Sequence, residues 1–226
     1  MISYRLPNFS ARANGFAFPN SFAPGTPVVE VQTPFGSWKF GDAGGGLCGG
    51  MVFAAMDYYA NGSAELPKTP GPELIRYFCK RLLDSWNLPL GAAKYYDWQR
   101  RKKGLMGKTI RGEWPRIRAR LDAGFPAPLG VINAQGYGWK QLCRNHQVLC
   151  YGYDLDEANR DVTLAIYDPN HPGDDGANLS FRVSDPEMEQ IAVHSCEGST
   201  VRGLFLSAYT RPRDPPPVHH TINGGV

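Results

Sequence analysis

The sequence predicts an α+β protein of two lobes, with helices in the first lobe and antiparallel β-strands in the second. Apolar residues recur at helical spacing in the first half of the chain, and short apolar runs bounded by turn residues follow in the second half. Helices followed by strands are typical of this class. We therefore expect a single domain over residues 1–211, with a helical lobe over about 28–125, a β-rich lobe over about 126–211, and a flexible tail over 212–226.

The composition is that of an ordinary globular protein. The 226 residues are 42% hydrophobic and 20% charged, and a chain of this length can bury a core without cross-links. Five cysteines at irregular spacings contain no CxxC pair, which predicts reduced thiols rather than disulfides or a zinc knuckle. No apolar stretch has the length of a signal-peptide core or a membrane span, so we expect a cytoplasmic protein, or one exported without a conventional signal peptide.

The N-terminal half predicts an arm, a hairpin and four helices. Residues 1–27 are rich in Pro, Asn, Ser and Phe and indicate an irregular surface arm. A strand over 28–32 alternates apolar and polar residues, and 38–40 is its expected hairpin partner. The helices are expected over 48–61 with one buried face, from Pro72 onward, over 93–101 and over 113–123.

The C-terminal half changes to the pattern of strands. Runs of apolar residues separated by turn-forming residues predict five strands, over 128–132, 146–154, 161–168, 179–184 and 203–210. The polar residues between 154 and 161 predict that the second and third of these strands form a hairpin.

Cys48 is the candidate nucleophile because of its place in the chain. It lies between two glycine runs, at the predicted start of the first helix. A helix N-terminus favours the thiolate over the thiol, and its free N–H groups can hold a developing oxyanion. The glycines allow a tight loop and leave space for a substrate. The alternative is that Cys48 is a small buried hydrophobic residue.

His146 and Asp168 are expected to lie together in the predicted hairpin. If the turn is centred on Glu157, the two residues face each other, with Cβ atoms about 5 Å apart. A carboxylate at that distance fixes the tautomer and orientation of an imidazole. Asn170, two residues further on, is a second candidate for this orienting role. The alternatives are a structural polar histidine and a simple Asp-Pro turn.

Three segments together resemble a known family. They are Gly-Leu-Cys-Gly-Gly at 46–50, His-Gln-Val-Leu-Cys-Tyr-Gly-Tyr-Asp at 146–154, and Tyr-Asp-Pro at 167–169. In this order they resemble the papain-like cysteine peptidase fold and look closest to the C39-like peptidase family. Members of that family place a cysteine at a helix start after a glycine-rich loop, then a strand with His-x-Val-x-x-x-Gly-Tyr-Asp, then a strand that ends in Asp-Pro. The resemblance covers about 40–210.

The resemblance implies a thiol hydrolase that cleaves a peptide or amide bond in a peptide or protein substrate, without a cofactor. Cys48 would be the nucleophile, His146 the base and then the acid, and Asp168 the orienting residue. The family usually has a glutamine about six residues before the cysteine as an oxyanion donor, and this chain has Asp42 there. Either Asp42 is protonated, another group such as Gln141 or Trp38 donates, or backbone N–H groups suffice.

Two further readings of the site are open. The first is a transglutaminase-like acyl transferase, which uses the same order of residues, and the second is a catalytically degenerate papain-like binding protein. Residues 94–120 hold ten basic and two acidic residues and could contact an acidic partner, although such runs more often form a solvated helix face, and we do not expect nucleic acid. Residues 194–196 and 219–220 contain histidine and cysteine without the spacing of four ligands, so no metal site is predicted.

Overall fold

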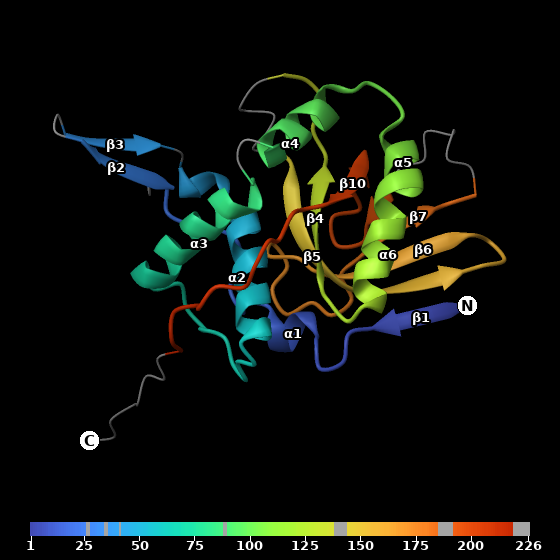
Figure 1. Cartoon of the computed structure of the whole chain (residues 1–226), viewed down its shortest axis with the longest axis horizontal. Coiled ribbons are helices and arrows are strands. Elements are labelled where there is room, and N and C mark those ends of the chain that lie inside the picture. The colour runs from blue at the N-terminus through green and yellow to red at the C-terminus, as the bar shows by residue number, and fades with distance from the viewer. Residues whose placement is uncertain are drawn as a thin grey trace.

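The computed structural model describes residues 1–25, 28–33, 36–40, 42–87, 90–137, 144–184 and 192–218. It is an α+β structure in which helices pack against an antiparallel sheet (Figure 1). Within these ranges the sheet has eight strands in the order β10-β4-β5-β6-β7-β8-β9, with β1 also paired to β5. The strands are β1 (Ile2–Arg5), β4 (Ala127–Ile132), β5 (His146–Asp156), β6 (Asp161–Tyr167), β7 (Asn178–Arg182), β8 (Ala192–His194), β9 (Thr200–Val201) and β10 (Gly203–Leu206). The expected early hairpin is present as β2 (Val29–Thr33) and β3 (Gly36–Phe40), which form a separate sheet.

In Figure 1, α2 and α3 lie to the left of the large sheet, whereas α5 and α6 lie over its middle, between β5 and β6 in this view. Helix α2 packs against β5, and α4 and α6 pack on β4. A π-helical turn over Thr109–Glu113 connects α5 to α6. The helices are α1 (Ala11–Asn14), α2 (Cys48–Ala60), α3 (Pro72–Ser85), α4 (Leu90–Arg100), α5 (Leu105–Lys108) and α6 (Trp114–Asp122).

Helix α2 is buried on all sides rather than on one face. Every residue from Gly49 to Tyr58 is buried. The prediction of a single buried face was therefore wrong, because α2 lies between α3 and β5 and both neighbours cover it. A helix with this much apolar surface is held in place by its packing, which fixes the position of its first residue, Cys48.

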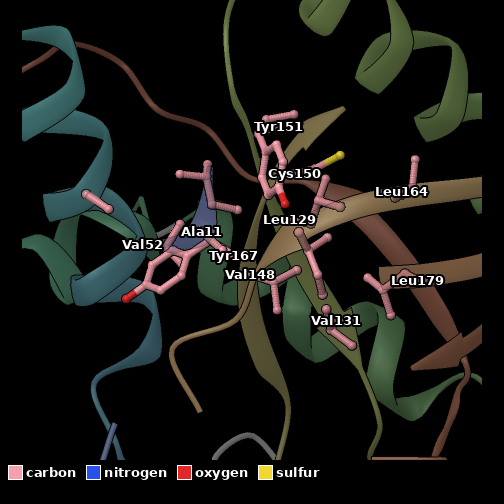
Figure 2. Packing of buried hydrophobic residues seen from close by; sticks show 14 of the residues in the cluster. Ala11, Val52, Leu129, Val131, Val148, Cys150, Tyr151, Leu164, Tyr167 and Leu179 are labelled. Carbon is pink, nitrogen blue, oxygen red and sulfur yellow. The ribbon is translucent and has the colours of Figure 1, made fainter. Parts of the chain in front are cut away.

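One hydrophobic core runs from the helices into the sheet. Val52 of α2, Val148 of β5 and Leu164 of β6 belong to the same buried cluster, and Figure 2 shows them together with Leu129 and Tyr167. The same core therefore contains residues from both predicted lobes, which meet near residue 125 of the sequence. A smaller cluster lies beneath α4 and consists of Tyr95, Trp98, Leu105, Ile132 and Phe205.

The N-terminal segment is more regular than expected. Ile2 pairs with Leu155, which makes β1 part of the large sheet, and α1 follows it. The backbone N–H of Phe16 then donates to the hydroxyl of the buried Tyr167 at 3.2 Å. The prediction of an irregular arm over 1–27 was wrong for these residues, because their pairing partners are some 150 residues away in the sequence.

The described part of the C-terminal tail is attached to α2 and α3. Asp57 and Arg81 form a buried ion pair, 2.7 Å between Oδ2 and Nε, and the hydroxyl of Tyr209 donates to Asp57 Oδ1 at 2.6 Å. The backbone N–H of Arg213 donates to the same oxygen at 3.0 Å, and the hydroxyl of Tyr58 donates to the carbonyl of residue 216 at 2.6 Å. This anchoring differs from the flexible tail expected from residue 212, and 219–226 lie outside the described residues.

The basic segment 94–120 forms α4, α5 and α6 and uses several of its charges internally. Asp97 lies 3.0 Å from Arg101 and 3.5 Å from Lys108, and Glu113 lies 2.7 Å from Lys94. An acidic partner for this segment stays a prediction. None of the helices in the described ranges is long and apolar enough to cross a membrane.

Candidate active site

Cys48 begins α2 and is partly exposed. The loop before it is a 3₁₀ turn over Ala43–Gly45, followed by Gly46 at a φ of 91°, a conformation that side-chain-bearing residues rarely adopt. The residue before Cys48, Leu47, makes no side-chain cap. Because the first N–H groups of a helix have no acceptor within it, the backbone around Cys48 presents donors and a partial positive charge.

Gly49 and Gly50, which follow Cys48, lie where neighbouring segments leave no space for a side chain. A Cβ atom on Gly50 would overlap the carbonyl oxygen of Phe78 in α3, and one on Gly49 would overlap the side chains of Ser85 and Gln147. Gln147 neighbours His146 in β5, and its amide donates to the Ser85 hydroxyl at 3.0 Å. Gly49 therefore allows the start of α2 to approach the strand that carries His146.

His146 is the first residue of β5 and is buried, with 8% of its surface exposed. Its Nε2 atom lies 2.7 Å from Oδ1 of Asp168. The predicted register is nevertheless wrong, because Leu149 pairs with Tyr167, so Asp168 follows the end of β6 and is not directly opposite His146. At this end of the hairpin the observed register differs from the predicted one by an even number of residues. The side chains of His146 and Asp168 therefore still point to the same face of the sheet.

Asp168 is fully buried and has polar neighbours on both carboxylate oxygens. Oδ1 also accepts a hydrogen bond from the backbone N–H of Asn170 at 2.8 Å. Oδ2 lies 2.8 Å from Nε2 of His194, although the two atoms are not aligned as a hydrogen bond. Burial raises the pKa of Asp168, but the contacts with His146 and His194 outweigh it and hold that pKa well below its ordinary value.

The imidazole of His146 connects the carboxylate to the thiol. Burial lowers the pKa of His146, but hydrogen bonds to Asp168 and to Cys48 together raise it to about 10. Because Nε2 is directed at Asp168, Nδ1 is the ring nitrogen left to face Cys48. The three predicted residues are therefore brought together in the order thiol, imidazole, carboxylate, and the ring next to the thiol favours its protonated form at neutral pH.

Tyr95 of α4 lies close to this group. Its side chain is buried, and its hydroxyl lies against Gly130 of β4, the neighbour of the residue that pairs with His146. Burial and the charge of Cys48 both raise the pKa of Tyr95, so the phenol stays neutral.

The remaining candidates have other roles or are not placed. Asp42 accepts hydrogen bonds from the backbone N–H groups of Gly44 and Gly25, at 2.9 and 3.0 Å, and so caps the 3₁₀ turn instead of donating to an oxyanion. Asn170 supports Asp168 through its backbone, and its side-chain oxygen accepts from Nδ2 of Asn20 at 3.2 Å. Gln141 lies outside the described residues, as does the side chain of Trp38.

Sequence reasoning missed two residues of this site, Asn20 and His194. The side chain of Asn20 accepts from the backbone N–H of Leu47 at 2.5 Å, and its own backbone N–H donates to the carbonyl of residue 169 at 2.9 Å. Asn20 therefore links the loop before Cys48 to the loop after Asp168. An asparagine in a segment rich in proline and serine indicates only a turn, so no sequence signal points to this role.

No family model, curated protein or solved structure matches this chain. Among the described residues, those that could hold a metal ion are Asp168, His171 and Glu197.

Proposed function

We propose that this chain is a cysteine-dependent hydrolase that cleaves peptide or amide bonds through Cys48, His146 and Asp168. The observation that carries the proposal is the series of contacts from thiol to imidazole to buried carboxylate, with Nε2 of His146 2.7 Å from Asp168. A helix that starts with the cysteine and packs against an antiparallel strand that starts with the histidine also supports a papain-like two-lobe arrangement.

In the first half of the reaction, the thiolate of Cys48 attacks the carbonyl carbon of the substrate. A C–S bond forms while the carbonyl π electrons move to oxygen, and the N–H groups at the start of α2 stabilise the resulting negative charge. The imidazolium of His146 then gives its proton to the leaving nitrogen. The C–N bond breaks, the amine leaves, and a thioester between substrate and Cys48 remains.

In the second half, water replaces the sulfur. His146, now neutral, takes a proton from the attacking water, the C–S bond breaks, and the thiolate leaves with its electron pair. This regenerates the imidazolium. Asp168 holds the ring in one orientation through both halves and stabilises its positive charge, but it does not itself take the proton.

The direct test is peptide turnover. We expect the chain to cleave members of a mixed peptide pool, detected by mass spectrometry as new termini, and Cys48→Ala to abolish cleavage. Cys196→Ala is the matched control, because Cys196 is also partly exposed but is far from His146 in the sequence and contacts Asp174 instead, 3.3 Å from its Oδ2. Cleavage that survives in Cys48→Ala would contradict the proposal.

The same assay separates hydrolysis from acyl transfer. With a primary amine added, a hydrolase releases the free acid from its thioester, whereas an acyl transferase releases the new amide. We expect the acid. Amide as the main product at millimolar amine would replace hydrolysis by acyl transfer on the same three residues.

A further inference from the structure

The residue after the thiol and the residue after the imidazole contact each other. Gly49 follows Cys48 in α2, and Gln147 follows His146 in β5. A Cβ atom on Gly49 would overlap Nε2 of Gln147, so the backbone of α2 lies directly against this amide. The separation of Cys48 from His146 is therefore set by a contact one residue further along each segment.

The amide of Gln147 is held by α3. Its Nε2 donates to Oγ of Ser85 at 3.0 Å, and that hydroxyl donates to the carbonyl of Leu82 at 2.8 Å. Gln147 and Ser85 are each 3% exposed. A Cβ atom on Gly49 would overlap Oγ of Ser85 as well. The first turn of α2 therefore lies over one buried hydrogen bond that joins α3 to β5.

This hydrogen bond is not needed to hold β5 in the sheet. The start of β5 is already held there by its backbone pairing with β4, in which Gly130 faces Gln147. Asn145, the other neighbour of His146, is fixed separately, because its Oδ1 accepts from two backbone N–H groups of the loop after β4, at 3.2 and 3.1 Å. The bond from Gln147 to Ser85 instead crosses from the sheet to the helices, so it sets the position of the helices relative to the strand.

The other end of the same amide has no partner. Oε1 of Gln147 is buried and makes no hydrogen bond to any residue that the structure describes. Buried polar atoms are nearly always partnered, and leaving one unpartnered costs stability. An apolar side chain of the same length would avoid that cost. The amide is therefore better explained by the position it gives α2 than by the stability of the core.

We propose that Gln147, through its hydrogen bond to Ser85, is a positioning residue that holds the start of α2 at the distance from His146 that the reaction needs. This inference rests on the proposed function. Consecutive residues of a strand point to opposite faces of the sheet, so Gln147 does not join the series of thiol, imidazole and carboxylate. It acts through the backbone that it supports. A shift of about 1 Å between reacting groups is enough to slow a reaction about 100-fold.

Gln147→Met tests this role, because methionine has a similar length but no amide. We expect alkylation of Cys48 by iodoacetamide to slow about tenfold, and peptide turnover to fall through kcat with KM little changed. We expect the melting temperature to stay close to the native value, because the variant loses one hydrogen bond and one unpartnered oxygen together. A lower melting temperature with native alkylation of Cys48 would show a purely structural role and overturn the proposal.

Thr109→Val is the matched control, because it removes a buried hydrogen bond elsewhere. Thr109 lies in the π-helical turn and is fully buried. Its Oγ1 donates to the carbonyl of Leu204 at 2.9 Å and accepts from the N–H of Leu204 at 2.8 Å. We expect this variant to melt at a lower temperature and to keep the native rate of Cys48 alkylation. Equal slowing in Thr109→Val and Gln147→Met would mean that any lost buried bond disturbs the thiol, which contradicts a specific role.

Ser85→Ala and the double variant test whether the hydrogen bond carries the effect. Removing either partner removes the same bond, so we expect Ser85→Ala to slow alkylation of Cys48 as Gln147→Met does. The double variant should then be no slower than either single variant. Effects that multiply in the double variant, or native alkylation in both single variants, would contradict the proposal.

Amide hydrogen exchange separates this inference from the proposed function. The N–H of Met51 donates to the carbonyl of Leu47 at 2.9 Å, so its exchange reports how firmly the start of α2 is held. We expect this exchange to quicken about tenfold in the two single variants but not in the control. If native Cys48 reacts no faster than Cys196, the proposed function fails, while the exchange still decides whether Gln147 positions α2. Unchanged exchange in both single variants overturns the positioning role.

Discussion

Nε2 of His146 lies 2.7 Å from Oδ1 of Asp168, and this contact leaves Nδ1 as the ring nitrogen that faces the Cys48 thiol. The carboxylate therefore holds the ring in one orientation and, together with Cys48, raises its pKa. Asp168→Asn keeps the shape but removes the charge, so we expect peptide turnover to fall about 100- to 10,000-fold. Asp156→Asn, at the last residue of β5 and so at the other end of that strand from His146, should leave turnover unchanged. Equal turnover in Asp168→Asn and the native chain would show that the contact has no catalytic role.

The same contact predicts how stability depends on pH. The folded-state pKa of His146 is about 10, above its ordinary value of 6.5, so its contribution is complete below about pH 6.5 and is lost as pH rises toward 10. The pKa of Asp168 lies below its ordinary value of 3.8, so its contribution is present above that pH and is lost as pH falls below it.

We therefore expect the melting temperature to be highest between about pH 4 and pH 6.5, the ordinary values of the two groups, and to fall on either side. Calorimetry from pH 3 to 10 measures this profile. In His146→Gln the decline above pH 6.5 should be smaller. An unchanged alkaline decline in that variant would assign it to other groups.

Asn20 is predicted to position the thiol without taking part in the chemistry. Its side chain holds the N–H of Leu47, and its backbone holds the loop after Asp168. In Asn20→Ala we expect the fold to persist by circular dichroism, and alkylation of Cys48 to slow about 10- to 100-fold through misplacement of the helix start. Arg12→Ala, in the same segment but 78% exposed, is the control. Full Cys48 reactivity in Asn20→Ala would exclude a positioning role.

Gly50 should tolerate no side chain, because a Cβ atom there would overlap the carbonyl oxygen of Phe78. We expect Gly50→Ala to lower the free energy of unfolding by about 1–3 kcal/mol, as overpacking does. Gly112→Ala is the matched control, since no atom of the described residues lies within 4 Å of its Cβ position, and it should raise stability by up to about 1 kcal/mol through helix propensity. Urea unfolding of both variants measures the difference, and a stabilised Gly50→Ala would contradict the described packing of α2 on α3.

Local patterns were sufficient to predict the elements that carry the proposed chemistry. The apolar run after Cys48 predicts α2, and the apolar run after His146 predicts β5, because each depends on neighbouring residues. The register between β5 and β6 could not be predicted in this way. It shifts at an irregularity between Cys150 and Gly152, where Gly152 is packed under the side chain of Arg5 from β1.

The parts that sequence reasoning missed depend on contacts between distant segments. β1 forms only because Ile2 meets Leu155, and Asn20 acts only because the N-terminal segment passes between two loops. His194 lies in a short strand with no distinctive pattern, and its contact with Asp168 follows from the pairing of β7 with β8. Spacing along the chain does not reveal such tertiary contacts.

The most direct test of the central claim is the rate at which each cysteine is alkylated. Iodoacetamide is applied at pH 6 to the folded chain, and peptide mapping assigns the modified residues. We expect Cys48 to react at least about tenfold faster than Cys196, because Cys48 lies at a helix start beside His146, whereas burial and the neighbouring Asp174 raise the pKa of the Cys196 thiol, and we expect this advantage to disappear in His146→Ala. If Cys48 reacts no faster than Cys196, or keeps its rate in His146→Ala, the proposed nucleophile and its base are not a functional pair.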